Sequence, residues 1–340
     1  MGYCVDQERI DEILMELSES YHIYAPRLDA QKKRVRFGKI TSVKQIVNDH
    51  QSDYSPKEVF YPISQVMFYF REDRVDECEM KDDKGILIFA RSCDINAVHR
   101  PDNIFLKNGG AEDVFYKRIR EKVKYILLEC PHSFEHCFCV SVGSNTTDEY
   151  SAAMRLGEDE ILIDVRDEDL KKYFEEEDQE TFNVRFIEEN DRKVRIPDVN
   201  RANLKDVSNL DYWKKFDDKC VACGGCNTVC GTCTCFDTVD IIYEEGSNEG
   251  ERRRIWSGCM LEDFTRTAGG SRSRKTQGAN MRFKVFHKFY DYKDRFGDDH
   301  MCVGCGRCDI RCPQDISFFD TVCELHDEIE IMKAEGKMGI

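Results

Sequence analysis

The sequence predicts two domains: an α+β or α/β domain over residues 1–205, and a mostly α-helical, cysteine-rich domain over residues 206–340. Residues 85–90 and 124–128 are almost continuously apolar, which is typical of strands buried on both faces of a parallel sheet. Residues 114–123, between these runs, are expected to form the crossover helix. Two cysteine runs of identical spacing mark the second domain.

Further elements of the first domain can be placed in chain order. The first is a helix, predicted by apolar residues at helical spacing: Ile10, Ile13, Leu14 and Leu17. Alternation over residues 32–40 and the apolar, aromatic residues 66–70 predict strands. Residues 161–165 predict another strand, and a helix is expected to begin near Asp167.

The connection between the domains is expected to be polar. Residues 175–180 form an acidic run and residues 190–197 are polar, which favours a solvated surface or a linker. The domain boundary is predicted between Pro197 and Tyr212.

The cysteine runs predict the chemistry of the second domain. Each reads Cys-x2-Cys-x2-Cys-x3-Cys: Cys220, Cys223, Cys226 and Cys230, then Cys302, Cys305, Cys308 and Cys312. In two-cluster ferredoxins the fourth cysteine of each run binds the other [4Fe–4S] cluster. We therefore expect two interacting clusters, one held by Cys220, Cys223, Cys226 and Cys312, the other by Cys302, Cys305, Cys308 and Cys230.

Zinc and disulfides are the competing interpretations. Structural zinc sites usually show separate CxxC pairs or Cys with His, and a disulfide framework belongs to short secreted chains. This chain has 340 residues and 18 cysteines, and Asp6 and Glu8 stand where a secretory signal would be basic and then apolar. The sequence therefore predicts an iron–sulfur electron carrier in a reducing, oxygen-poor cytoplasm.

A helix over residues 280–296, with Val285, Phe289 and Tyr292 on one face, leads directly into the second run. It favours a mostly helical two-cluster domain over a small β-sheet ferredoxin. Residues 246–296 are basic in an otherwise acidic protein; their cations include Arg252, Arg253, Arg254, Arg266, Arg272, Arg274, Lys275, Arg282 and Lys284. They could dock an acidic partner, raise the potentials of anionic clusters, or be ordinary surface charge.

A third metal site is predicted in the first domain. Cys93 follows one apolar strand, Cys130 follows the next, and Cys137 and Cys139 lie just beyond. Because cofactors gather at the carboxyl ends of parallel strands, we expect these four thiols to converge on a third [4Fe–4S] cluster. Alternatively, Cys93 and Cys130 are small buried hydrophobes. A competing set without a fourth thiol nearby comprises Cys233, Cys235 and Cys259.

The composition and the absence of several motifs exclude some classes of function. A net charge of -16 argues against nucleic acid as a partner, and no apolar run approaches the ~18 residues that span a bilayer. The sequence contains no GxGxxG, Walker or HExxH motif. We therefore expect a chain that relays electrons, has no catalytic residues of its own, and belongs to a larger reductase.

The chain resembles the iron–sulfur electron-transfer subunit of the anaerobic sulfite reductase of enteric bacteria and is similar to the β subunits of soluble sulfhydrogenases. The motifs are RSCD at 91–94, CFC at 137–139, CGTCTCFD at 230–237, WSGC at 256–259 with AGG at 268–270, and HKF at 287–289. The resemblance implies a relay that takes electrons from a flavin subunit, which oxidises NADH, and passes them to a sirohaem subunit, which reduces sulfite to sulfide. In one departure, Gly231 stands where the family pattern usually has Pro.

Two alternatives remain open at the level of sequence. One keeps the relay but places it in a cytoplasmic NAD(P)-linked hydrogenase or sulfhydrogenase. The other is an iron–sulfur redox sensor, against which the doubled cysteine run argues, because sensing favours one exposed, labile cluster.

Overall fold

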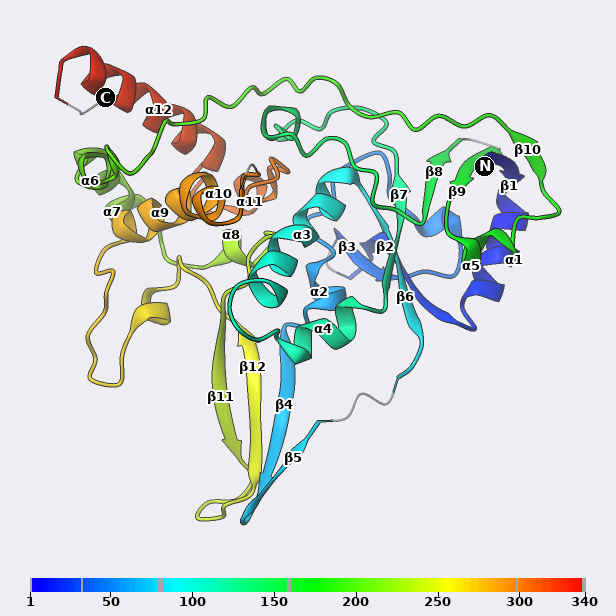
Figure 1. Ribbon diagram of the computed structural model, residues 1–340, viewed down its shortest axis with the longest axis horizontal. Helices are drawn as coiled ribbons and strands as arrows, with labels where there is room; N and C mark the ends of the chain where they lie inside the picture. The colour runs from blue at the N-terminus through cyan, green and yellow to red at the C-terminus, as the bar shows by residue number, and fades with distance from the viewer. Residues whose placement is uncertain (1, 32, 79–81, 158–159, 298, 338–340) are drawn as a thin grey trace.

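A computed structural model describes residues 2–31, 33–78, 82–157, 160–297 and 299–337. Within these ranges the chain forms a mixed α/β structure with an eight-stranded sheet, a four-stranded sheet and a helical C-terminal part (Figure 1). None of the helices in the described ranges is both long and apolar enough to cross a membrane.

The larger sheet has the strand order β10-β1-β9-β8-β7-β6-β2-β3. Its strands are β1 (Gly2–Asp6), β2 (Tyr21–Asp29), β3 (Arg34–Lys39), β6 (Gly85–Ala90), β7 (Val123–Leu128), β8 (Ala152–Leu156), β9 (Glu160–Val165) and β10 (Asp178–Glu180). The central strands β2, β6, β7 and β8 are parallel, and the outer pairs are antiparallel. The two apolar runs are therefore adjacent parallel strands, as predicted.

Helices cover both faces of this sheet. On one face lies α1 (Gln7–Leu17), whose N-cap residue Asp6 accepts a hydrogen bond from the Arg9 amide at 2.8 Å. On the other lie α3 (Ser92–Leu106) and α4 (Val114–Arg120). A hydrophobic core lies on each face of the sheet, and alternate residues of β6 point into one or the other. Leu87 and Phe89 belong to the core on the α1 side, and Ile88 and Ala90 belong to the core on the α3 side. Both faces are buried, which explains why the strand is apolar throughout.

The smaller sheet joins distant parts of the chain. Its antiparallel order is β11 (Phe236–Ile242), β12 (Gly250–Trp256), β4 (Ser64–Arg71), β5 (Arg74–Glu77). It projects from the body of the molecule as an arm (Figure 1). Because β11 and β12 lie between the two cysteine runs, the expectation of a mostly α-helical second domain is not confirmed.

The remaining helices are short, apart from α12, and most lie in the C-terminal part. They are α2 (Lys57–Phe60), α5 (Glu168–Lys171), α6 (Leu204–Ser208), α7 (Lys215–Lys219), α8 (Gly225–Thr228), α9 (Gln277–Phe286), α10 (Tyr292–Phe296), α11 (Arg307–Arg311) and α12 (Phe318–Ala334). A π-helical turn, His287–Asp291, connects α9 to α10. The helix predicted over residues 280–296 is therefore present, with a π-turn in its middle.

The polar segment that follows β10 is only partly a solvated linker. In Figure 1 it runs along the top of the molecule from the larger sheet to α6. Within it Asn190 is only 3% exposed. Its side-chain amide nitrogen donates to Ser133 Oγ at 2.9 Å, and its Oδ1 accepts from the Val140 amide at 2.8 Å. Asn190 thus anchors the segment to the loop that carries Cys137 and Cys139, a role that polarity alone does not reveal.

Candidate metal centres

The first group of thiols, Cys220, Cys223, Cys226 and Cys312, lines a single cavity. Cys220 ends α7, Cys226 lies in α8, and Cys312 ends α11. Gly224 starts α8 at φ 66°, and a Cβ there would lie 2.7 Å from Leu261 Cδ2, so the turn requires glycine. Cys223 is exposed and the adjoining Val221 is 57% exposed. This group therefore lies at the surface.

The second group combines Cys230, from the first cysteine run, with Cys302, Cys305 and Cys308 of the second run. Burial raises the pKa of Cys302 to about 12, and negative charge at Cys305 and Cys230 adds to this effect. Burial likewise raises the pKa of Cys308, with Cys302 and Cys305 close enough to contribute. Cys230 thus lies near Cys302 and Cys305 of the later run.

Two glycines allow the second cysteine run to pack closely against the backbone of residues 136–139. Gly304 and Gly306 have φ values of 62° and 71°. A Cβ on Gly304 would lie 2.6 Å from the Phe138 carbonyl carbon, and one on Gly306 would lie 2.2 Å from the His136 oxygen. The Phe138 amide donates to the Gly304 carbonyl at 2.8 Å. The second cysteine run therefore contacts the loop of the third thiol group directly.

The third group, Cys93, Cys130, Cys137 and Cys139, also lines one cavity, beside Arg91, Phe134 and Asn190. Burial raises the pKa of Cys130 to about 11 and of Cys137 to about 12, and the neighbouring thiols contribute in both cases. The four thiols predicted to converge at the strand ends are therefore brought together.

The three groups follow one another through the molecule. Cys137 Sγ lies 4.0 Å from the Cys305 carbonyl oxygen, and charge at Cys305 acts on the pKa of Cys93. Toward the surface, Cys308 of the second group also lines the cavity of the first. The second group is therefore the middle one.

Three buried lysines accompany the thiols. Lys57, Lys284 and Lys288 are 2%, 4% and 6% exposed, and none takes part in a carboxylate ion pair within the described ranges. Burial alone would lower the pKa of Lys284, but negative charge at Cys226 and Cys308 raises it well above its usual value. Lys284 thus lies between the first and second groups, a placement that the basic composition of its segment did not distinguish.

Most arginines of the basic insert form ion pairs within this chain. Arg252 binds Asp240 at 2.6 Å, and the buried Arg254 binds Asp113 at 2.7 Å. Further ion pairs are Arg253–Glu251, Arg266–Asp263 and Arg272–Glu262. The insert is therefore not a continuous unpaired basic surface. The ion pairs favour ordinary surface charge for the exposed arginines, whereas Arg254 is a buried structural cation and Lys284 is a cation beside cysteine thiols.

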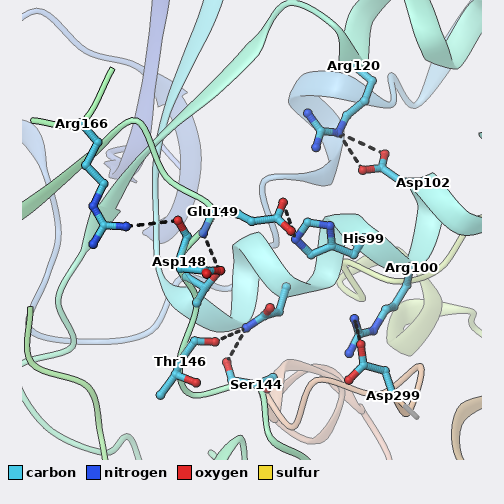
Figure 2. A network of polar contacts seen from close by, with 12 residues as sticks. His99, Arg100, Asp102, Arg120, Ser144, Thr146, Asp148, Glu149, Arg166 and Asp299 are labelled. Atoms are coloured by element: carbon cyan, nitrogen blue, oxygen red, sulfur yellow. Dashed lines mark hydrogen bonds and ion pairs between the residues drawn. The ribbon is translucent and has the colours of Figure 1, made fainter. Parts of the chain in front are cut away.

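Polar residues missed by sequence reasoning hold the second cysteine run in place. Gln51 Nε2 donates to the Cys305 carbonyl at 2.5 Å, and Ser144 Oγ donates to the Val303 carbonyl at 2.6 Å. Figure 2 shows Arg100 of α3 pointing to Asp299 just before this run; its Nη1 lies 3.0 Å from that carboxylate and its Nε 3.0 Å from the His300 carbonyl oxygen. No single residue type or spacing identifies these contacts in advance.

The donor sets fit [4Fe–4S] clusters. Each group offers four soft thiols, the ligands that such clusters require, and the buried Lys284 and Lys288 lie where their charge offsets that of the thiolates. In the part of the chain that is described, no three His, Cys, Asp or Glu side chains are grouped to hold a single metal ion.

Comparisons with known proteins agree with this chemistry. Residues 219–316 match a family model described as a 4Fe-4S dicluster domain. The chain is 28% identical to the sulfhydrogenase 2 subunit beta of Pyrococcus furiosus over 346 aligned residues, which cover 94% of this chain and 97% of the relative. No solved structure matches significantly. The chain carries [4Fe–4S] clusters.

Proposed function

We propose that this chain is the iron–sulfur electron-transfer component of a hydrogenase-type oxidoreductase complex. The observation that carries the proposal is the succession of three four-cysteine groups, in which the middle group adjoins both others. The relative that matches nearly the whole chain is named as a sulfhydrogenase subunit, which favours the hydrogenase alternative over the sulfite reductase expected first. None of the comparisons supports sulfite as the substrate.

The proposed ligands follow the cross-ligated pattern. The surface cluster is assigned to Cys220, Cys223, Cys226 and Cys312, and the middle cluster to Cys302, Cys305, Cys308 and Cys230. The third cluster is assigned to Cys93, Cys130, Cys137 and Cys139, whose shared cavity supports four-thiolate ligation. This third assignment extends the two-cluster domain into the N-terminal half.

When bound, a [4Fe–4S] cluster accepts and releases single electrons. The residues of this chain fix the order of the clusters and place lysines beside the thiols. Lys284 lies beside thiols of two groups, so its charge favours reduction at both. The exposed first group provides one terminus for exchange with a partner subunit.

The proposed partners, in a cytoplasmic complex, are a flavin subunit that oxidises NAD(P)H and a second subunit that carries out catalysis. Isolation of the native complex without oxygen tests this assignment. Nickel in a co-purifying subunit would support a complex of the hydrogenase type. Sirohaem in that subunit would instead support the assignment to a sulfite reductase. A chain that purifies alone with its clusters, and with neither partner at any salt concentration, would contradict a role within a complex.

A further inference from the structure

A fourth set of thiols lies outside the three proposed cluster sites. Cys233 and Cys259 are 6% and 5% exposed, and Cys235 is half-buried. The Cys233 and Cys235 side chains are hydrogen-bonded to each other. The Asn227 amide donates to Cys233 Sγ at 3.6 Å and to Cys259 Sγ at 3.3 Å. Two thiols are thus in contact, and an amide separates them from the third.

The position of Asn227 is fixed by its surroundings. Its Oδ1 accepts a hydrogen bond from the Met260 amide at 3.2 Å. A Cβ on Gly258 would lie 2.6 Å from Asn227 Cγ, so the glycine leaves the space that this side chain occupies. Asn227 therefore holds Cys233 and Cys259 on a single amide group.

Two buried lysines flank the thiol pair. Burial lowers the pKa of Lys57, whereas at Lys288 the effect of burial is outweighed by negative charge at Cys230 and Cys233, which raises its pKa. Lys57 Nζ donates to the Cys233 carbonyl at 3.1 Å and lies 3.8 Å from the centre of the Trp256 ring. Lys288 Nζ donates to Thr232 Oγ1 at 2.6 Å, and that hydroxyl lies 3.3 Å from Cys230 Sγ. Positive charge in a buried site stabilises a sulfur anion. Thr232 and Lys288 also connect the pair to a proposed ligand of the middle cluster.

We propose that Cys233 and Cys235 form a redox-active thiol pair that stores two electrons beside the one-electron clusters. In the oxidised form an S–S bond joins the two residues. Two reduced [4Fe–4S] clusters each supply one electron, the S–S bond breaks, and one proton from water yields a Cys235 thiol and a Cys233 thiolate. The reverse reaction returns two electrons to oxidised clusters and releases that proton. This inference rests on the proposed function for its source of electrons.

The chain between the two cysteines permits such a bond. A disulfide requires Cα atoms ~4.4–6.8 Å apart, and only Thr234 separates the residues. The Cys233 amide donates to the Cys230 carbonyl at 3.3 Å, so the chain turns just before Cys233.

Anaerobic reductive titration of the clustered protein tests the proposal. Wild-type protein, first oxidised with ferricyanide, is expected to take up two more electrons per chain from titanium(III) citrate than Cys233→Ser or Cys235→Ser protein. Iron content should be the same in all three. Cys4→Ser, far from the site in β1, is the matched control and should behave like wild type. Denaturation, alkylation of free thiols and mass spectrometry of the wild type should locate the disulfide at Cys233 and Cys235 only before reduction.

The outcomes separate this proposal from the previous one. Equal electron uptake in all variants, with Cys233 and Cys235 fully alkylated after oxidation, would overturn the thiol pair. Iron loss in both serine variants would also overturn it, because the thiols would then be cluster ligands. Wild-type protein that binds no iron under any reconstitution would overturn the proposed function instead. The pair itself is tested independently by equilibration with dithiothreitol redox buffers.

Discussion

Asp94 and Arg307 form a bidentate ion pair in which each side chain is only 2% exposed. Nη1 lies 2.6 Å from Oδ1, and Nη2 lies 3.1 Å from Oδ2. Arg307 also donates from Nε to the Ser52 carbonyl at 2.9 Å. Because Asp94 follows Cys93 and Arg307 lies between Cys305 and Cys308, the pair fixes the third thiol group relative to the middle one.

Removing the Asp94 charge should destabilise the protein strongly. Asp94→Asn leaves a buried guanidinium without its counter-ion, so we expect the free energy of unfolding to fall by roughly 3–5 kcal/mol. Anaerobic urea denaturation of the clustered protein measures this. Asp240→Asn is the matched control, since both side chains of the Arg252–Asp240 pair are exposed, at 44% and 42%, and it should cost far less stability because exposed ion pairs contribute little. Equal losses in both variants would contradict a special role for the Asp94 pair.

Double variants test cross-ligation. If Cys312 binds the surface cluster, Cys312→Ser combined with Cys220→Ser removes one cluster, about four irons per chain, whereas Cys312→Ser with Cys302→Ser removes about eight. Iron and acid-labile sulfide analysis distinguishes the two. The opposite pattern would mean that each run holds its own cluster.

Iron stoichiometry also tests the third cluster. Fully reconstituted wild-type protein should hold about twelve irons per chain, and Cys137→Ala about eight. Cys323→Ala serves as the control because Cys323 lies in α12, outside the three groups. A wild-type value that stops near eight, unchanged by Cys137→Ala, would remove the third cluster.

Neutralising Lys284 should lower cluster potentials. A cation near two clusters favours their reduced, more negative forms, so Lys284→Met should lower the potentials of the surface and middle clusters by on the order of 50–100 mV. Lys284→Arg keeps the charge, and Lys275→Met removes an exposed one; both should have smaller effects. Redox titration followed by electron paramagnetic resonance gives the potentials. An unchanged pair of potentials in Lys284→Met would exclude this electrostatic role.

Local patterns predicted much of the first half of the fold. The apolar runs at 85–90 and 124–128 are β6 and β7, which pair in parallel. They were predictable because a strand buried on both faces is apolar at almost every position. The helix α3 was not predicted: Pro101 interrupts the pattern, and polar residues such as Asp94 and Arg100 are buried in it by partners far along the chain. Tertiary ion pairs outweigh a weak local preference there.

The candidate sites were predictable where spacing carries the chemistry. The cysteine runs indicate their cofactor, and strand ends indicated where Cys93 and Cys130 would meet Cys137. In contrast, Lys284 reads as one more basic residue, and only the fold places it among thiols. The pairing of β12 with β4 joins residues far apart in sequence, so no local sequence pattern predicts the four-stranded sheet.

The pairing of β4 with β12 also orders events during synthesis. On the ribosome, Ser64–Arg71 emerges long before its partner Gly250–Trp256 exists, so this sheet has only the hairpin of β4 and β5 to begin with. Asp94 likewise cannot form its ion pair until Arg307, which lies 213 positions later, has been synthesised. The thiols of the N-terminal half therefore gain these neighbours only after the second cysteine run has been synthesised. The proposed middle cluster takes ligands from both cysteine runs, so it can be completed only after the second run has been synthesised.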